Sequence, residues 1–221
     1  MMRVPGFGGW SEDPLWASFY DWSVEHPRAG GVVWKAGIGS DLSRLYAAAA
    51  EIGRQPAGSS VLDVPCGGGV ALRGLRPGQG IRYVAADISP AMLDRTREAA
   101  HERGVADQVE TQVADVGALP FGDGEFDLVV SFTGLHVFGD PHAAMLEMGR
   151  VTHPGGVLTG SALLNDTGLR TVPIRRLGRL SGLLGPSATQ AEVRTWMLEA
   201  GFTDVTLEMS GAMGYFRGVR R

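Results

Sequence analysis

The chain has 221 residues, 44% of them hydrophobic, and a formal net charge of −4. This length suits one domain over residues 1–221 with a sizeable core, and the acidic balance argues against a nucleic-acid-binding surface. No apolar stretch reaches the roughly 18 residues of a membrane span, and the N-terminus lacks the apolar core of a secretory signal. The single cysteine, Cys66, excludes an internal disulfide. We therefore expect a cytoplasmic location.

Short apolar runs rich in branched residues alternate with helical patterns along the chain. Five runs bounded by Gly or Pro predict buried strands at residues 59–64, 81–87, 108–115, 126–132 and 155–164. Three other segments carry helix signals. They run from the N-cap Ser89 to Gly104, from the N-cap Asp140 to Pro154-Gly155, and from the N-cap Thr189 to Gly201.

The regular succession of strand and helix predicts parallel strands joined by right-handed crossovers. The C-terminal residues 204–221 differ, because two strand patterns follow each other across Ser210-Gly211 with no helix between them. A hairpin at the sheet edge explains this pattern and makes the last strand antiparallel. The expected fold class is therefore α/β, a doubly wound, seven-stranded, mostly parallel sheet with an antiparallel C-terminal edge hairpin.

The first strand runs into a loop with three consecutive glycines, in the stretch VLDVPCGGGVAL at residues 61–72. A phosphate-binding P-loop needs Gly-Lys-Ser/Thr, but the only lysine, Lys35, precedes an alanine. The dinucleotide fingerprint G-x-G-x-x-G fits Gly67 and Gly69 but meets Leu72 at its third glycine. A plain turn remains an alternative, although a turn alone rarely needs three glycines beside an acid.

The segment LDVPCGGG resembles motif I of the class I S-adenosylmethionine-dependent methyltransferases, with Asp63 at the acidic position and Pro65 in place of the first glycine. Four later segments resemble this family in the same order: DISPAML, VADVGALPF, FDLVVSFTGLHVF and EMGRVTHPGGVL. The resemblance covers roughly residues 44–160 and implies a Rossmann-like methyltransferase fold that binds S-adenosylmethionine.

The resemblance also implies roles for individual residues. Asp63 would hold the ammonium group of the cofactor, Asp87 the ribose diol, and Asp115 the adenine amino group. Each acid has a structural alternative: a cap, a solvated strand end or a turn. The full expected cofactor-binding set is Tyr20, Asp63, Pro65, Cys66, Gly67, Gly69, Asp87, Ile88, Met92, Asp115, Val116 and Ser131.

His136 follows the fourth predicted strand, in a loop that borders the transferred methyl group in this family. It is the best-placed candidate for a general base, and the alternative is that it packs or caps the next helix. Five histidines and one cysteine give no usual metal-ligand spacing, so we expect no metal site.

Two variable segments would shape the acceptor site. Residues 1–43 form an expected N-terminal helical cap rich in aromatic residues, in which Tyr20 occupies the place of a tyrosine often found over the cofactor. Residues 165–188 form an expected insert in which leucines alternate with arginines. This insert is either a lid for an apolar or anionic acceptor or a solvated helix packed by its leucines.

The leading hypothesis is a methyltransferase for a small, apolar or amphipathic metabolite. The alternatives are a non-catalytic module that binds S-adenosylmethionine or S-adenosylhomocysteine and acts through a partner, and a nicotinamide-dependent oxidoreductase, against which Leu72 argues. The expected partners are a small-molecule acceptor and a second copy in a homodimer, without nucleic acid or an integral membrane span.

Overall fold

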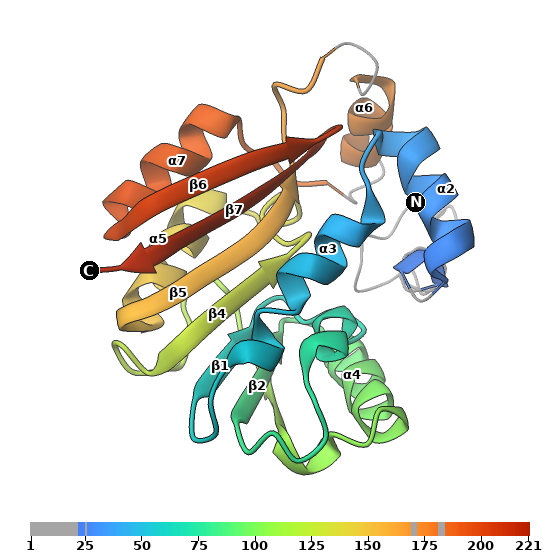
Figure 1. Ribbon diagram of the computed structural model, residues 1–221. Coiled ribbons are helices and arrows are strands. Elements are labelled where there is room, and N and C mark those ends of the chain that lie inside the picture. The colour runs from blue at the N-terminus through green and yellow to red at the C-terminus, as the bar shows by residue number, and fades with distance from the viewer. Residues whose placement is uncertain (1–21, 25, 169–171, 181–183) are drawn as a thin grey trace, which may run out of the picture.

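A computed structural model describes residues 22–24, 26–168, 172–180 and 184–221. Its centre is a seven-stranded sheet in the order β3-β2-β1-β4-β5-β7-β6 (Figure 1). The strands are β1 Ser60–Asp63, β2 Arg82–Asp87, β3 Val109–Val113, β4 Phe126–Phe132, β5 Thr152–Leu163, β6 Phe202–Ser210 and β7 Met213–Arg220.

The strands β1 to β5 are parallel, and β7 is antiparallel to both β5 and β6. The predicted fold class and its antiparallel hairpin are thus confirmed. The hairpin lies at the sheet edge as predicted, with β7 between β5 and β6 and with β6 as the outermost strand.

Helices cover both faces of the sheet. Their bounds are α2 Pro27–Ile38, α3 Leu42–Ala49, α4 Pro90–Glu102, α5 Pro141–Val151, α6 Val172–Leu180 and α7 Gln190–Glu199, with short 3-10 helices at η1 Ile52–Arg54, η2 Val70–Gly74 and η3 Ala106–Gln108. Buried side chains of α3 and α4 share one core cluster with one face of the sheet, and those of α5 and α7 share a second cluster with the other face.

The helix starts follow the predicted capping residues. The Asp140 side chain accepts a hydrogen bond from the Ala143 amide, and Thr189 forms a capping box with Glu192. Ser89 is the N-cap of α4 but makes no side-chain cap bond. The predicted end of α5 at Pro154-Gly155 is wrong, because α5 stops at Val151 and both residues lie inside β5.

The expected N-terminal cap is only partly described, and Tyr20 lies outside the described residues. Trp34 is buried and donates its indole N–H to the Ser23 hydroxyl at 3.2 Å, whereas Trp22 is 42% exposed and stacks on His26. The described part therefore contains both packed and exposed aromatic residues. Within the described ranges, no helix is both long and apolar enough to cross a membrane.

Candidate functional site

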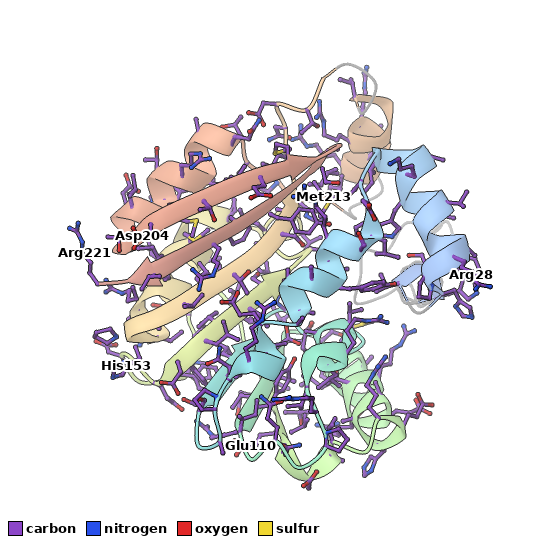
Figure 2. The ribbon with its side chains drawn as sticks, viewed as in Figure 1. Arg28, Glu110, His153, Asp204, Met213 and Arg221 are labelled. Atoms are coloured by element: carbon purple, nitrogen blue, oxygen red, sulfur yellow. The ribbon has the colours of Figure 1, made fainter. Side chains whose placement is uncertain are left out.

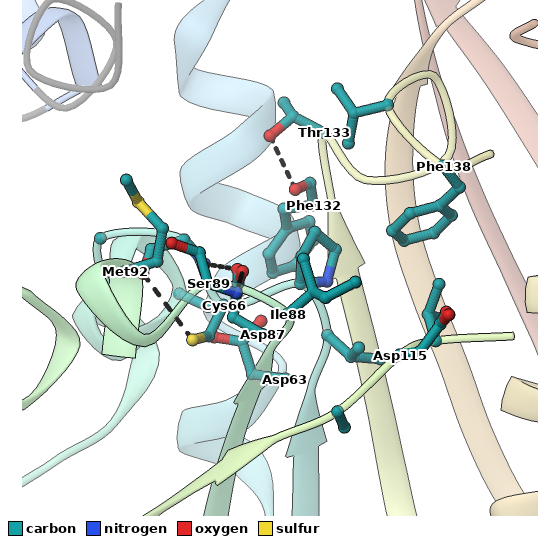
Figure 3. Close-up of a pocket in the computed structure, with 18 of the residues that line it drawn as sticks. Asp63, Cys66, Asp87, Ile88, Ser89, Met92, Asp115, Phe132, Thr133 and Phe138 are labelled. Atoms are coloured by element: carbon teal, nitrogen blue, oxygen red, sulfur yellow. Dashed lines mark hydrogen bonds between the residues drawn. The ribbon is translucent and has the colours of Figure 1, made fainter. Parts of the chain in front are cut away.

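A cavity of about 610 Å³ opens at the carboxyl ends of the strands, where the strand order reverses around β1. Reversal points of this kind are the usual ligand sites of open α/β sheets. The residues that line the cavity come from four segments, one at the carboxyl end of each of the strands β1 to β4, and they fall within the ranges 63–71, 87–92, 114–117 and 132–140. Figure 3 shows how side chains from these segments converge.

Two glycines of the loop after β1 are required for different reasons. Gly67 lines the cavity and has φ +51°. A Cβ built on Gly67 would meet no atom within 4 Å. Gly69 has φ +84° and does not line the cavity, and a Cβ there would lie 3.0 Å from Leu72 Cδ1. Gly67 thus leaves room for a ligand beside the backbone, and Gly69 permits close packing.

Asp63 ends β1 at the floor of the cavity and is only 1% exposed. The Tyr83 hydroxyl donates a hydrogen bond of 2.7 Å to Asp63 Oδ2. Burial raises the pKa of Asp63 to about 7, and the nearby Asp87 charge adds to the increase. Asp63 is therefore about half protonated at neutral pH in the empty cavity, and a cation that enters the cavity favours its carboxylate form.

Asp87 ends β2 and is bonded through both carboxylate oxygens to backbone amides. Oδ1 accepts from the Ser89 amide at 2.9 Å, and Oδ2 accepts from the Gly67 amide at 3.0 Å. Burial raises the pKa of Asp87, and the backbone hydrogen bonds oppose this increase. Each carboxylate oxygen has a second lone pair, so Asp87 can hold the glycine loop and still accept hydrogen bonds from a ligand.

Cys66 and Pro65 also line the cavity. The Thr96 hydroxyl donates to the Gly67 carbonyl oxygen at 2.8 Å and lies 3.4 Å from Cys66 Sγ. Burial raises the pKa of the Cys66 thiol well above its usual value, so this cysteine is a packing residue at neutral pH. The Pro65 ring contacts the loop after β4, since a Cβ on Gly134 would lie 2.5 Å from Pro65 Cδ.

The opposite wall follows β2 and β3. Met92 is nearly buried, whereas Ile88 is 66% exposed at the rim. Asp115 lines the cavity together with Val116, and its Oδ1 accepts a hydrogen bond from the Gly117 amide at 2.9 Å. Asp115 therefore stabilises a turn, which is the structural alternative given for it above. Its other carboxylate oxygen remains available to a ligand.

The loop after β4 contributes an apolar wall of Phe132, Val137 and Phe138. Thr133, between them, has φ +55°, a left-handed conformation that is unfavourable for a β-branched residue. Ser131 is expected at the site but does not line the cavity, and among the described residues its buried hydroxyl has no hydrogen-bond partner.

His136 lies behind this wall rather than in it, and it is 8% exposed. Its Nδ1 accepts a hydrogen bond of 3.0 Å from the Leu163 amide, so the neutral ring carries its proton on Nε2. Burial lowers the pKa of His136 to about 4. This arrangement favours the packing alternative, and the general-base role stays a prediction. His153 lies outside the site, at the amino end of β5 (Figure 2).

Sequence reasoning missed two side chains that shape the site, Tyr83 and Thr96. Tyr83 pairs with Val61 in the β1–β2 register, which places its hydroxyl beside Asp63 two residues later. A tyrosine inside a strand of small apolar residues was the available signal, because a buried hydroxyl needs a partner. The sequence carries no comparable signal for Thr96, which lies in the middle of α4.

The charged residues that line the cavity are all acidic. Its ionisable lining residues are Asp63, Cys66, Asp87, Asp115 and Asp140, and no Lys, Arg or His from the described part of the chain lines it. A cationic ligand is favoured in such a site, since each carboxylate lowers the electrostatic energy of a positive group.

Residues 62–159 match the family described as a methyltransferase domain. A demethylmenaquinone methyltransferase of Thermus thermophilus is 38% identical over 122 residues, which are 55% of this chain and 54% of that protein. An uncharacterized protein of Mycobacterium tuberculosis is 36% identical over 118 residues, 53% of this chain and 40% of that protein. The chain thus spans about half the length, or less, of these curated relatives.

The fold has close counterparts among solved structures. A possible exported protein from Bordetella parapertussis is 21% identical with a TM-score of 0.76, over 99% of this chain and 90% of that chain. This similarity extends the shared fold beyond the segment matched by sequence. In the match over residues 62–159 and in the order and direction of its seven strands, the chain is similar to the class I S-adenosylmethionine-dependent methyltransferases.

Proposed function

We propose that the protein binds S-adenosylmethionine and transfers its methyl group to a small, apolar or amphipathic acceptor. The observation that carries this proposal is the acid-lined cavity at the reversal of strand order, where Gly67 leaves space beside the backbone. The cofactor has a positive sulfonium and an ammonium group, and both suit a cavity whose charged lining residues are carboxylates.

Three acids would hold three parts of the cofactor. Asp63 would bind the ammonium group, Asp87 the ribose diol, and Asp115 the adenine amino group. The distribution of these carboxylates over the ends of β1, β2 and β3 supports the assignment, since the cavity follows the same three strand ends. Ile88, Met92 and Val116 would pack on the adenosine, while the contact proposed for Tyr20 falls on a residue that is not described.

The acceptor would lie against the apolar wall formed by Phe132, Val137 and Phe138. When bound, the cofactor supplies an activated methyl carbon, whose bond to sulfur breaks as the acceptor lone pair bonds to it. The chain positions the acceptor for this in-line displacement and excludes water. A proton lost by the acceptor needs a base or solvent, and a role for His136 in this step remains to be tested.

Several narrower assignments belong to the same proposal. A cytoplasmic location is supported by the single, buried and unpaired Cys66. The cap formed by residues 1–43 and the lid formed by residues 165–188 are proposed from the sequence pattern alone, and a homodimer is also proposed. The acceptor class is supported by the similarity to a relative named as a demethylmenaquinone methyltransferase.

The alternative is a module that binds the cofactor without catalysis. Calorimetry with S-adenosylmethionine and S-adenosylhomocysteine first establishes binding, and transfer of isotopically labelled methyl groups to a metabolite and lipid extract then tests catalysis. Labelled product that disappears in a Gly67→Val variant supports the methyltransferase. Tight cofactor binding without labelled product in any fraction supports the binding module, and absence of cofactor binding refutes both.

A further inference from the structure

A second cavity, of about 450 Å³, lies along α6 in the insert. It is lined by Asn165, Val172, Arg175, Arg176, Arg179 and Leu180. Three guanidinium groups thus converge on one cavity to which no described residue contributes an acid, in a chain with a net charge of −4. The charge of this lining is opposite in sign to that of the first cavity, which is lined by carboxylates.

The side chains of the three arginines form hydrogen bonds with neutral groups or, for one of them, with no described residue. Arg175 Nη1 donates to the Leu164 carbonyl oxygen at 3.1 Å and to Thr167 Oγ1 at 2.8 Å. Arg179 Nη2 donates to Asn165 Oδ1 at 2.8 Å and to the Pro186 carbonyl oxygen. Within the described residues, Arg176 has no side-chain partner. Two guanidinium groups are therefore oriented while their charge stays uncompensated.

Five other arginines of the described chain differ in this respect. Arg44, Arg82, Arg97, Arg150 and Arg217 all form ion pairs with Asp or Glu side chains. No such pair involves the three arginines of α6 within the described ranges. The acidic partners that neutralise those five arginines are thus missing, among the described residues, where the three arginines of α6 meet, which leaves their charge for an anionic ligand.

Apolar side chains flank the arginines. Val172 is 41% exposed and Leu180 is 74% exposed, and both line the cavity. Positions 172, 176 and 180 are four residues apart, so these two apolar side chains share a face of α6 with Arg176 between them. The surface therefore suits a molecule that carries an anionic group next to an apolar chain.

The position of α6 connects this cavity with the proposed acceptor site. The helix lies beyond the carboxyl end of β5, the strand next to β4 (Figure 1). The Leu184 amide donates to the Gly178 carbonyl oxygen at 3.0 Å, and the Gly185 amide donates to the His136 carbonyl oxygen at 2.8 Å. Gly185 also packs on the backbone of Phe138, which lines the first cavity.

We propose that Arg175, Arg176 and Arg179 bind the phosphate group of an amphipathic methyl acceptor. Guanidinium forks match phosphate oxygens, and three of them supply enough charge for a dianion. The concave site fits one head group better than a flat membrane surface. The identification of the bound molecule as the acceptor rests on the proposed function, whereas binding of the phosphate group does not.

The test uses the full chain and monomeric dodecyl phosphate as the probe, with dodecyl trimethylammonium as the oppositely charged control. Calorimetry should show binding of dodecyl phosphate that weakens about tenfold or more in Arg176→Gln, the effect of losing a charge-assisted hydrogen bond. Arg176 has no partner to lose, so the fold should be unaffected. Arg54→Gln removes one exposed charge at η1 and should bind like the wild type.

Equal affinity of the wild type and Arg176→Gln for dodecyl phosphate overturns the proposal, as does equal binding of the two probes. Arginine-dependent binding to phosphatidylglycerol vesicles without binding to the monomeric probe also overturns it, in favour of a membrane surface. Inorganic phosphate alone should bind more weakly than dodecyl phosphate, since Val172 and Leu180 would contact the chain. Cofactor affinity, measured in parallel on Arg176→Gln, should be unchanged, so that failure of cofactor binding is distinguishable from failure of the phosphate site.

Discussion

If Asp63 binds the ammonium group of the cofactor as proposed, the affinity for the cofactor should depend on pH by an amount that can be calculated. Its pKa rises from an ordinary 3.8 to about 7 in the empty cavity, because the carboxylate is buried. Three units correspond to about 4 kcal/mol of opposition to the charged form. A cationic ligand that contacts Asp63 favours the carboxylate, so binding below pH 7 must release a proton. The affinity should therefore rise with pH and level off above about 7.

The expected size of the effect follows from the protonated fraction of Asp63. At pH 6 about nine in ten copies of a group with a pKa of about 7 carry a proton, so the affinity for S-adenosylmethionine should be about tenfold below its plateau. The unliganded protein should show the opposite trend. The stabilising contribution of Asp63 to folding is full below about pH 3.8 and is lost as the pH rises through about 7.

Calorimetry between pH 5.5 and 7.5, in buffers with different heats of ionisation, measures both the affinity and the proton release. In Asp63→Asn the pH dependence should disappear, because the titrating group is gone. Asp107→Asn, an exposed acid at η3 outside the cavity, should retain the wild-type profile. A flat profile in the wild type, or a slope that survives in Asp63→Asn, refutes the reasoning.

Four substitutions test the rest of the site. Gly67→Ala adds a methyl group to a left-handed residue that faces the cavity, so calorimetry should show cofactor affinity at least about tenfold lower and denaturation a loss of about 1–2 kcal/mol. Asp87→Ala should weaken cofactor binding by about 2 kcal/mol, and unchanged affinity would remove Asp87 from the site. His136→Gln should reduce turnover less than tenfold while lowering stability, because Nδ1 serves the Leu163 amide; a fall of about 10² to 10⁴ at unchanged stability would establish a general base. Thr133→Gly should leave the free energy of unfolding unchanged or higher, because relief of about 1–3 kcal/mol of strain offsets the glycine entropy, and a clear loss would show that Thr133 is unstrained.

The sequence by itself determined the elements and the place of the site. Strand β4 has the predicted bounds, β2 begins one residue later than predicted and ends at the predicted residue, and β1 and β3 are shorter than predicted by one or two residues at each end. These elements follow from the local alternation of apolar runs, caps and glycines. The acids Asp63, Asp87 and Asp115 could be placed in one cavity, because each one lies at or just after the carboxyl end of a strand of the same parallel sheet.

Only the tertiary structure decided how the side chains are paired. The hairpin pattern predicted two antiparallel strands, but the pairing of β7 with β5 depends on contacts between distant segments. Likewise, the hydrogen bond from Tyr83 to Asp63 and the bond from the Leu163 amide to His136 join residues that are 20 and 27 positions apart. Local patterns specify which face of an element is buried, whereas packing between elements sets which polar groups meet, and with them the protonation of Asp63 and the tautomer of His136.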